Sequence, residues 1–256
     1  SIMKKKLVIA NWKMNLNMHD SSIFLHNLSQ KVKTHRNLET ILAPSTFTLQ
    51  SLSLQVNHRQ FKLAAQNFYW RDHGAFTGEV AISQLRGIVQ YALVGHSERR
   101  NIFHETDKDI RAKVAAAIRN DIRPILCVGE NSDERNYDET NLVISDQLIG
   151  GLANVSSEDI EKVVIAYEPV WAIGTGVNAM PEDVRKAVRV IRRQIADLYG
   201  KKASKNIQVV YGGSIQPEFA ADYAKLREID GLLIGGASLS ADKFAQIVEK
   251  VYESVK

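Results

Sequence analysis

The sequence contains a single cysteine, so no disulfide can form within the chain. That residue, Cys127, lies in the apolar run ILCVGE, where burial as a reduced thiol is the expected state. A lone reduced thiol is compatible with the reducing cytoplasm, which is where we expect the protein. No apolar run approaches the roughly 20 residues that cross a membrane. The apolar stretch 7–10 behind the basic start is too short for a secretion signal, so we expect no membrane partner.

A strong charge excess and a linker are also missing. The 33 basic and 29 acidic residues leave a net charge of +4, too mild and too scattered to indicate a nucleic-acid partner. No stretch rich in proline, glycine or serine divides the 256 residues. We therefore expect residues 1–256 to form a single domain. Because the chain begins with Ser1 instead of Met, residues 1–5 are expected to be a disordered or cloning-derived start.

Short apolar runs recur along the chain, each about as long as a β-strand. They lack the alternation of polar and apolar residues that a half-exposed strand shows, which indicates strands buried on both faces of a parallel sheet. The runs are Leu7–Asn11, Thr40–Ala43, Lys62–Gln66, Tyr91–Gly95, Ile125–Gly129, Val163–Glu168, Ile207–Gly212 and Leu232–Gly235.

Amphipathic segments lie between most of these runs. Thr106 to Asp109 matches a capping box and predicts a helix with an apolar face. Pro181 is the expected first residue of another helix, and Ser240 precedes a third. Further helical stripes are predicted at 20–32, 46–57, 80–90, 134–150 and 217–228, of which 46–57 is the weakest.

Eight strand runs about 32 residues apart on average match repeated β–α units. Eight such units in a chain of this length favour a closed (β/α)8 TIM barrel with eight parallel strands. The rival is an open, doubly wound sheet, which usually has a glycine turn for phosphate after its first strand. Here that turn reads ANWKMN and contains no glycine.

Polar and glycine residues follow several strand runs, at the end where barrel enzymes carry their active sites. Taken singly, each has an ordinary explanation as a solvated charge, a structural histidine or a turn. Their joint placement on one rim makes chance less plausible, because unrelated residues would scatter over both ends. The candidates are Asn11, Lys13, His96, Ser97, Glu98, Glu168, Gly212-Gly213-Ser214 and Gly235-Gly236-Ala237-Ser238.

The glycine turns after the last two strands predict a phosphate site. A phosphate needs several backbone N–H donors, and glycine lets the chain approach it without a Cβ clash. The loops after strands seven and eight are a frequent phosphate site in this fold. A helix start near Ser238 would add positive partial charge, and Lys13 would supply a full one.

Five motifs, taken together, resemble the triosephosphate isomerase family in order and spacing, over nearly the whole chain. The segments GHSERR and YEPVWAIGTG together are highly specific. The motifs are Asn11–Asn15, Gly95–Arg100, Ala166–Gly176, Tyr211–Ser214 and Gly235–Ser238.

This resemblance implies an isomerase of glycolysis and gluconeogenesis that interconverts dihydroxyacetone phosphate and D-glyceraldehyde 3-phosphate through an enediolate. It implies no metal and no organic cofactor. Glu168 is the implied base, His96 the electrophile, and Lys13, with Asn11 beside it, the holder of substrate charge. Ser97 and Glu98 are implied to support Lys13 and His96, and the implied phosphate donors are the backbones of Gly174, Ser214, Gly235 and Gly236.

The resemblance also implies that residues 169–179 form a lid. Residues 169–171 read as its N-terminal hinge, and Tyr211 and Ser214 are expected to latch the closed lid near Gly176 and Ala179. The family often has lysine where Val177 stands, which puts the behaviour of the C-terminal hinge in question.

A homodimer is the further implication. Gly74–Glu79 matches the family's dimer loop, so we expect dimerisation through the 68–79 loop, with its tip near Asn11 of the other subunit. The following residues, 80–83, lack the Ser-Pro often found there. The aromatic residues 68–70 suit either the interface or burial in the barrel.

Two other functions fit the sequence less well. A Schiff-base aldolase on the same barrel would need a reactive lysine at one of the later strand ends, and none is present from strand four to strand eight. A non-catalytic barrel that binds phosphorylated ligands or partner proteins would keep the glycine turns but would not need both Glu168 and His96.

Overall fold

The computed structural model describes residues 4–175 and 177–255 and contains a closed ring of eight parallel strands. Neighbouring strands pair in sequence order, and β8 pairs with β1 to close the ring. The predicted (β/α)8 barrel is therefore confirmed, and the open sheet is excluded. The strands are β1 (Lys6–Asn11), β2 (Leu38–Ala43), β3 (Phe61–Ala65), β4 (Tyr91–Val94), β5 (Arg123–Val128), β6 (Val164–Tyr167), β7 (Gln208–Gly213) and β8 (Gly231–Ile234).

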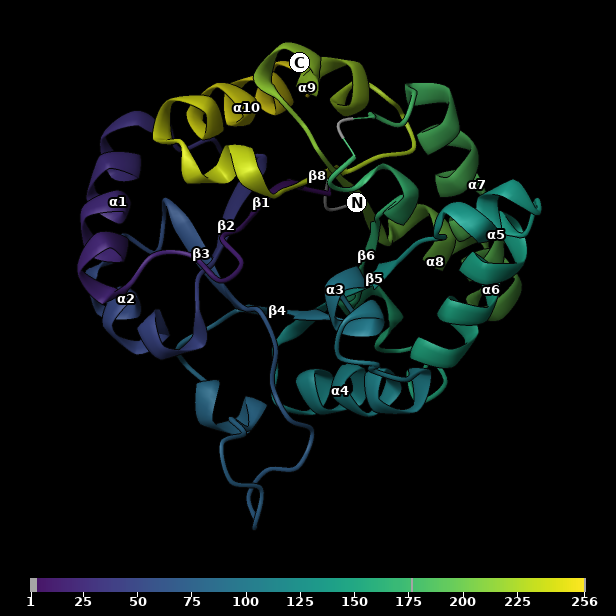
Figure 1. Ribbon diagram of the computed structural model, residues 1–256, viewed down its shortest axis with the longest axis horizontal. Helices are drawn as coiled ribbons and strands as arrows, with labels where there is room; N and C mark the ends of the chain where they lie inside the picture. The colour runs from purple at the N-terminus through teal and green to yellow at the C-terminus, as the bar shows by residue number, and fades with distance from the viewer. Residues whose placement is uncertain (1–3, 176, 256) are drawn as a thin grey trace.

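Helices surround the ring (Figure 1). In the described part of the chain, none of them is both long and apolar enough to span a membrane. The α-helices are α1 (Met18–Lys31), α2 (Leu49–Gln55), α3 (Ser97–Asn101), α4 (Asp107–Arg119), α5 (Ser132–Asn136), α6 (Thr140–Gly151), α7 (Pro181–Tyr199), α8 (Lys201–Asn206), α9 (Pro217–Ala224) and α10 (Ala241–Glu253). Short 3-10 turns cover η1 (Thr46–Thr48), η2 (Ile82–Leu85), η3 (Ile160–Lys162), η4 (Val170–Ala172) and η5 (Gly236–Leu239).

Each strand buries both of its faces, which explains the continuous apolar runs. In β1, Leu7 and Ile9 belong to the cluster inside the barrel, whereas Val8 and Ala10 belong to the larger cluster beneath the helices. Cys127 also lies inside the barrel, as a buried free thiol. A side chain on either face of a strand is thus removed from water, so alternation in the sequence disappears.

The predicted helix starts are confirmed. Thr106 accepts from the N–H of Asp109, and the Asp109 carboxylate accepts from the N–H of Thr106, both at 3.2 Å. Pro181 is the first residue of α7, where its missing N–H has no partner to lose. Ser240 caps α10 by accepting from the N–H of Lys243.

The helix predicted at 80–90 is wrong. Only the turn η2 forms there, because Ala81 forms a β-bridge with Tyr69 and Val80 accepts a hydrogen bond from the Tyr69 N–H. These contacts close the base of the 68–79 loop, which extends away from the ring (Figure 1). Gly87, with φ +79°, then ends the segment in a conformation that no α-helix accepts.

The helix predicted at 134–150 is interrupted. α5 ends at Asn136 and α6 begins at Thr140, with Asp138 between them at φ +58°. The helix predicted at 217–228 is shorter, since α9 ends at Ala224. The short helices α3 and α8 were not predicted.

Two remaining expectations concern the start of the chain and the aromatic residues at 68–70. Residues 1–3 lie outside the described residues, and Lys4 pairs with Asp230 at 3.2 Å. Phe68 is buried in the main core, whereas Tyr69 and Trp70 are half-buried and stacked on each other. Of the three aromatic residues, only Phe68 is therefore fully buried.

Closure of the ring depends on a close approach at Gly231. An ideal Cβ on Gly231 would lie 1.9 Å from the carbonyl oxygen of Leu7. We expect Gly231→Ala to lower the free energy of unfolding by about 2 kcal/mol or more, because β8 must move away from β1. Urea unfolding measures this, with Gly236→Ala as the control, since no atom lies within 4 Å of its Cβ position. Equal unfolding midpoints for the two variants would contradict the close-approach argument.

Candidate active site

A carboxylate and an imidazole meet at the carboxyl end of the barrel. Glu168 directly follows β6, and His96 is the N-cap residue of α3, just after β4. Oε2 of Glu168 lies 2.9 Å from Nε2 of His96, and both side chains are buried. Two strand-end residues that were singled out from the sequence are therefore in direct contact.

The hydrogen bonds of His96 place its proton. Nδ1 accepts from the backbone N–H of Glu98 at 3.2 Å, so a neutral ring carries its proton on Nε2. That proton points at Glu168. The imidazole can therefore donate from Nε2 without carrying a positive charge.

Burial and the ion pair act in opposite directions on this contact. Burial of the ring opposes a charge on His96, but the neighbouring Glu168 carboxylate outweighs it and raises the pKa of His96. Burial likewise opposes a charge on Glu168, but His96, the backbone N–H of Ser97 and Lys13 together lower the pKa of that carboxyl. Glu168 is thus an ionised carboxylate in a site that would otherwise keep it neutral.

One carboxylate oxygen remains unpaired. Oε1 of Glu168 is buried and has no hydrogen-bond partner among the described residues. A buried polar atom without a partner is uncommon, and its cause is often functional. Oε1 is thus available to a group that enters the site.

Lys13 is held in a strained backbone conformation beside this pair. Its φ is +54°, unusual for a residue other than glycine. The side chain of Asn11 accepts from its N–H at 3.0 Å, and Gln66 donates to its carbonyl oxygen at 2.9 Å. Its ammonium group pairs with Glu98 at 2.7 Å, so the predicted neighbours of Lys13 are in place.

The residues predicted to bind phosphate lie at the open rim. An ideal Cβ on Gly235 would lie 3.8 Å from Nζ of Lys13, which places this turn beside the ammonium group. Within the described ranges, the N–H groups of Gly174, Ser214 and Gly236 have no hydrogen-bond acceptor, and these three residues are exposed. Three N–H donors are therefore available, and the turn that carries one of them, Gly236, lies beside the ammonium group.

Two glycines let the backbone close around Glu168. A Cβ on Gly129 would lie 1.7 Å from the Glu168 carbonyl oxygen, and one on Gly212 would lie 3.2 Å from its Cγ. Cys127 is the other neighbour, and burial together with the Glu168 charge raises the pKa of its thiol. The thiol is therefore protonated and takes no part as a nucleophile.

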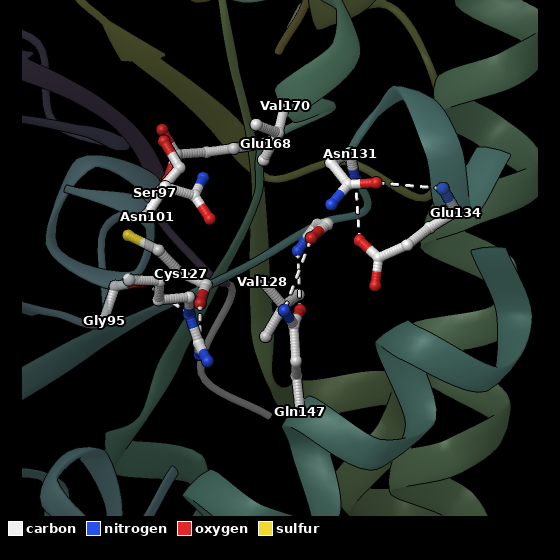
Figure 2. A pocket seen from close by; sticks show the side chains of 12 residues that line it. Gly95, Ser97, Asn101, Cys127, Val128, Asn131, Glu134, Gln147, Glu168 and Val170 are labelled. Carbon is white, nitrogen blue, oxygen red and sulfur yellow. Dashed lines mark hydrogen bonds between the residues drawn. The ribbon is translucent and has the colours of Figure 1, made fainter. Parts of the chain in front are cut away.

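The rim is divided into two cavities. One, of about 200 Å³, is lined by Glu168, Ser97 and Cys127 on one side and by Asn131 and Gln147 on the other (Figure 2). The second, of about 230 Å³, is lined by residues from the ends of β1, β3 and β4, namely Asn11, Lys13, Met14, Gln66, Asn67, Leu93, His96, Glu98, Arg99 and Phe103. The contact between His96 and Glu168 joins the linings of these two cavities.

The segment 169–179 leaves the barrel directly after Glu168. Its first part is tied down, since the N–H of Val170 donates to the carbonyl oxygen of Glu130 at 3.0 Å. Of the expected latch, Gly176 lies outside the described residues. Tyr211 packs its ring against that of Tyr223, and it is Tyr223 that donates to the carbonyl oxygen of Ala179.

Sequence reasoning missed three supporting residues. Gln66 ends the third strand run and binds the Lys13 carbonyl, so its position was a usable signal. Glu130 is fully buried and accepts from the Tyr167 hydroxyl at 2.7 Å. Arg100 joins β4 to β5 through the carbonyl oxygens of Gly95 and Cys127; it belongs to the GHSERR motif, but this role was not predicted.

No metal site accompanies this arrangement in the part of the chain that the structure describes. There, no three His, Cys, Asp or Glu side chains are grouped so that they could hold a metal ion.

Comparison with known proteins adds a family to this geometry. The profile described as "Triosephosphate isomerase" matches residues 6–251. The triosephosphate isomerase of Treponema denticola is 45% identical over 246 residues, which cover 96% of this chain and 98% of that protein. That of Caldanaerobacter subterraneus subsp. tengcongensis is 41% identical over 247 residues, with 96% and 99% covered. That of Dictyoglomus thermophilum is 39% identical over 248 residues, with 96% and 100% covered. With a family match along almost its whole length and such relatives, the chain belongs to the triosephosphate isomerase family.

Proposed function

We propose that Glu168 and His96 carry out the interconversion of dihydroxyacetone phosphate and D-glyceraldehyde 3-phosphate in this enzyme. The single observation that supports these roles is the buried contact of 2.9 Å between a carboxylate and an imidazole Nε2. Isomerisation of a hydroxy ketone requires a base beside the carbon that loses the proton and a donor beside the carbonyl oxygen. The pair supplies both, within reach of one small substrate.

The steps follow from the positions of the protons. Glu168 removes a proton from the carbon beside the carbonyl, while the Nε2 proton of His96 stabilises the carbonyl oxygen as it becomes negative. The resulting enediolate exchanges a proton between its two oxygens through the same ring nitrogen. Glu168 then returns its proton to the neighbouring carbon, which completes the conversion of ketone into aldehyde.

The environment of Glu168 makes it a stronger base once the substrate is bound. In the substrate-free pair, His96 lowers the pKa of the carboxyl against the opposing effect of burial. A substrate that separates the two side chains removes that contribution and leaves the burial, which raises the pKa. The base therefore gains proton affinity when it faces carbon, where proton affinity is needed.

The anionic end of the substrate is assigned to the rim. Lys13 supplies the positive charge and Asn11 holds its backbone, while Glu98 supports the imidazole with its N–H and the ammonium group with its carboxylate. Ser97 supports the base, because its backbone N–H helps to lower the pKa of Glu168. The available N–H groups of Gly174, Ser214 and Gly236, together with Gly235, would bind the phosphate oxygens. Because Gly174 belongs to segment 169–179, phosphate binding would also draw this lid over the site and exclude water.

Neither a metal nor an organic cofactor enters these steps, and acid–base chemistry by side chains is sufficient for them. We place the enzyme in the cytoplasm, where the reduced state of buried Cys127 is stable. We assign it no membrane or nucleic-acid partner.

A homodimer through the 68–79 loop is the proposed assembly. The loop extends from the barrel (Figure 1), and several large apolar side chains are exposed, among them Met14, Phe47 and Phe103. Phe47 follows Ser45 by two residues, and the Ser45 hydroxyl donates to the carbonyl oxygen of Lys13 at 3.4 Å. Met14 and Phe103 line that cavity together with Asn11. A second copy that inserted its loop there would cover these side chains and complete the wall of the site.

Replacement of the base tests the proposed chemistry. We expect Glu168→Gln to lower kcat by about 10² to 10⁴, because the amide cannot accept the proton from carbon. An assay that couples dihydroxyacetone phosphate formation to NADH oxidation measures this. Glu249→Gln is the matched control, since Glu249 also contacts a histidine, His35 Nε2 at 2.8 Å, but lies on α10. Near-native turnover in Glu168→Gln, or no turnover in the folded wild type, would sink the proposal.

The charge of Glu168 should be readable on His96. Because Glu168 raises the pKa of His96, we expect Glu168→Gln to shift the titration of this ring to lower pH. The pair stabilises the fold below the folded-state pKa of His96 and above that of Glu168, and it is lost outside that window. A pH titration of the ring nitrogens by ¹⁵N NMR measures the pKa of His96 in the wild type and in the variant. A pKa that stays constant or rises in the variant would contradict the assigned contact.

The dimer has its own test. We expect the wild type to sediment at twice its chain mass of 28.7 kDa, and Phe47→Asp to raise the dissociation constant at least about tenfold, because a charge would enter an apolar interface. Phe219→Asp is the control, since Phe219 is also exposed but lies on α9. Sedimentation equilibrium measures both. A monomeric wild type, or equal effects of the two variants, would refute the interface.

A further inference from the structure

Tyr211 and Tyr223 lie at the C-terminal end of segment 169–179. Tyr211 belongs to the expected latch, whereas Tyr223 has no role assigned above. Tyr223 on α9 donates its hydroxyl to the carbonyl oxygen of Ala179 at 2.5 Å. Its ring lies 4.5 Å from the ring of Tyr211 on β7. Tyr223 and Ala179 are both buried, so this bond is shielded from water.

The contact between the two rings positions the Tyr223 hydroxyl. The ring planes are tilted by 32° and pack against each other, and Tyr211 is itself buried. Burial raises the pKa of both phenols, so both hydroxyls keep their protons. The Tyr223 proton is therefore available to the Ala179 carbonyl.

The position of Ala179 gives this chain its importance. Ala179 is the last residue of the segment, and Met180 after it is already fixed as the N-cap of α7, with its N–H donating to Asp183. At the other end, Val170 is fixed to the carbonyl of Glu130. Between these two anchors Gly174 is exposed, with no atom within 4 Å of its Cβ position.

We propose that Tyr223 is a positioning residue of the lid: its hydroxyl fixes the carbonyl of Ala179, so that the lid turns about a defined C-terminal hinge. The inference rests on the lid function proposed above for residues 169–179. A defined hinge returns the N–H of Gly174 to the same place at each closure. The ring of Tyr211 packs against that of Tyr223 beside the hinge.

Removal of one oxygen atom tests the role. Tyr223→Phe keeps the ring packing against Tyr211 but removes the donor to Ala179. Tyr199→Phe is the matched control, because the Tyr199 hydroxyl also bonds to backbone carbonyls, those of Leu152 and Val155, away from the lid. Both variants lose a hydroxyl group that is hydrogen-bonded to a main-chain carbonyl, so urea unfolding should report similar losses of stability.

Kinetics should separate the two variants. We expect Tyr223→Phe to lower kcat by about two- to tenfold, the effect of one neutral hydrogen bond. We also expect more inorganic phosphate released per isomerisation, because a loosely closed lid lets the enediolate expel its phosphate as the C–O bond breaks. Tyr199→Phe should match the wild type in both measurements. Wild-type kinetics and phosphate release in Tyr223→Phe, or equal changes in both variants, would overturn the inference.

A double-variant cycle tests whether the effects of Tyr211 and Tyr223 on turnover are coupled. If they are, Tyr211→Phe combined with Tyr223→Phe should reduce kcat by less than the product of the two single effects. Multiplicative effects would overturn the coupling. Wild-type turnover and its loss in Glu168→Gln are measured alongside. If turnover does not depend on Glu168, the proposed function itself fails; if it does and Tyr223→Phe is unchanged, only the hinge inference fails.

Discussion

Closure of the strand ring by the pairing of β8 with β1 is the constraint on which the other features depend. Because all eight strands are parallel, their carboxyl ends face the same rim, and residues far apart in the chain become neighbours there. Lys13 comes from the first strand end, His96 from the fourth and Glu168 from the sixth. An open sheet of the same strands would spread these ends along a line, and no contact between Glu168 and His96 would follow.

The rim combines a buried base with exposed N–H donors. Glu168 is buried, and only its neighbours keep it ionised, so its basicity responds to any movement of His96. The N–H donors of Gly174, Ser214 and Gly236 are exposed, so water can satisfy them without substrate. Burial of the base costs free energy, whereas exposure of the phosphate donors costs little. The lid proposed for residues 169–179 would, on closing, exclude water from these donors as well.

Much of this arrangement could be predicted from the sequence, for a definite physical reason. Strands buried on both faces leave continuous apolar runs, and a polar residue at the end of such a run is conspicuous, as Glu168, His96 and Lys13 are. The expected helix at 80–90 was wrong because its apolar spacing was real but tertiary contacts with Tyr69 took its backbone groups. Glu130 acts through the hydroxyl of Tyr167, 37 residues away along the chain, a contact that no local pattern records.

For segment 169–179, the local sequence pattern identifies the segment, whereas only the tertiary structure shows which residues contact its far end. The motif 169–179 identifies a small apolar segment bounded by a proline hinge and by glycines, but it does not say what holds the far end. At that end the structure has a bond from Tyr223 on α9, well outside the motif, to Ala179, and the proposed hinge assigns the task to it. A lid with a loose far end could still cover the site, yet its Gly174 donor would reach the phosphate in many orientations. In the proposed hinge, fixing one carbonyl would remove that freedom where the segment meets α7 and would leave the exposed middle free to move.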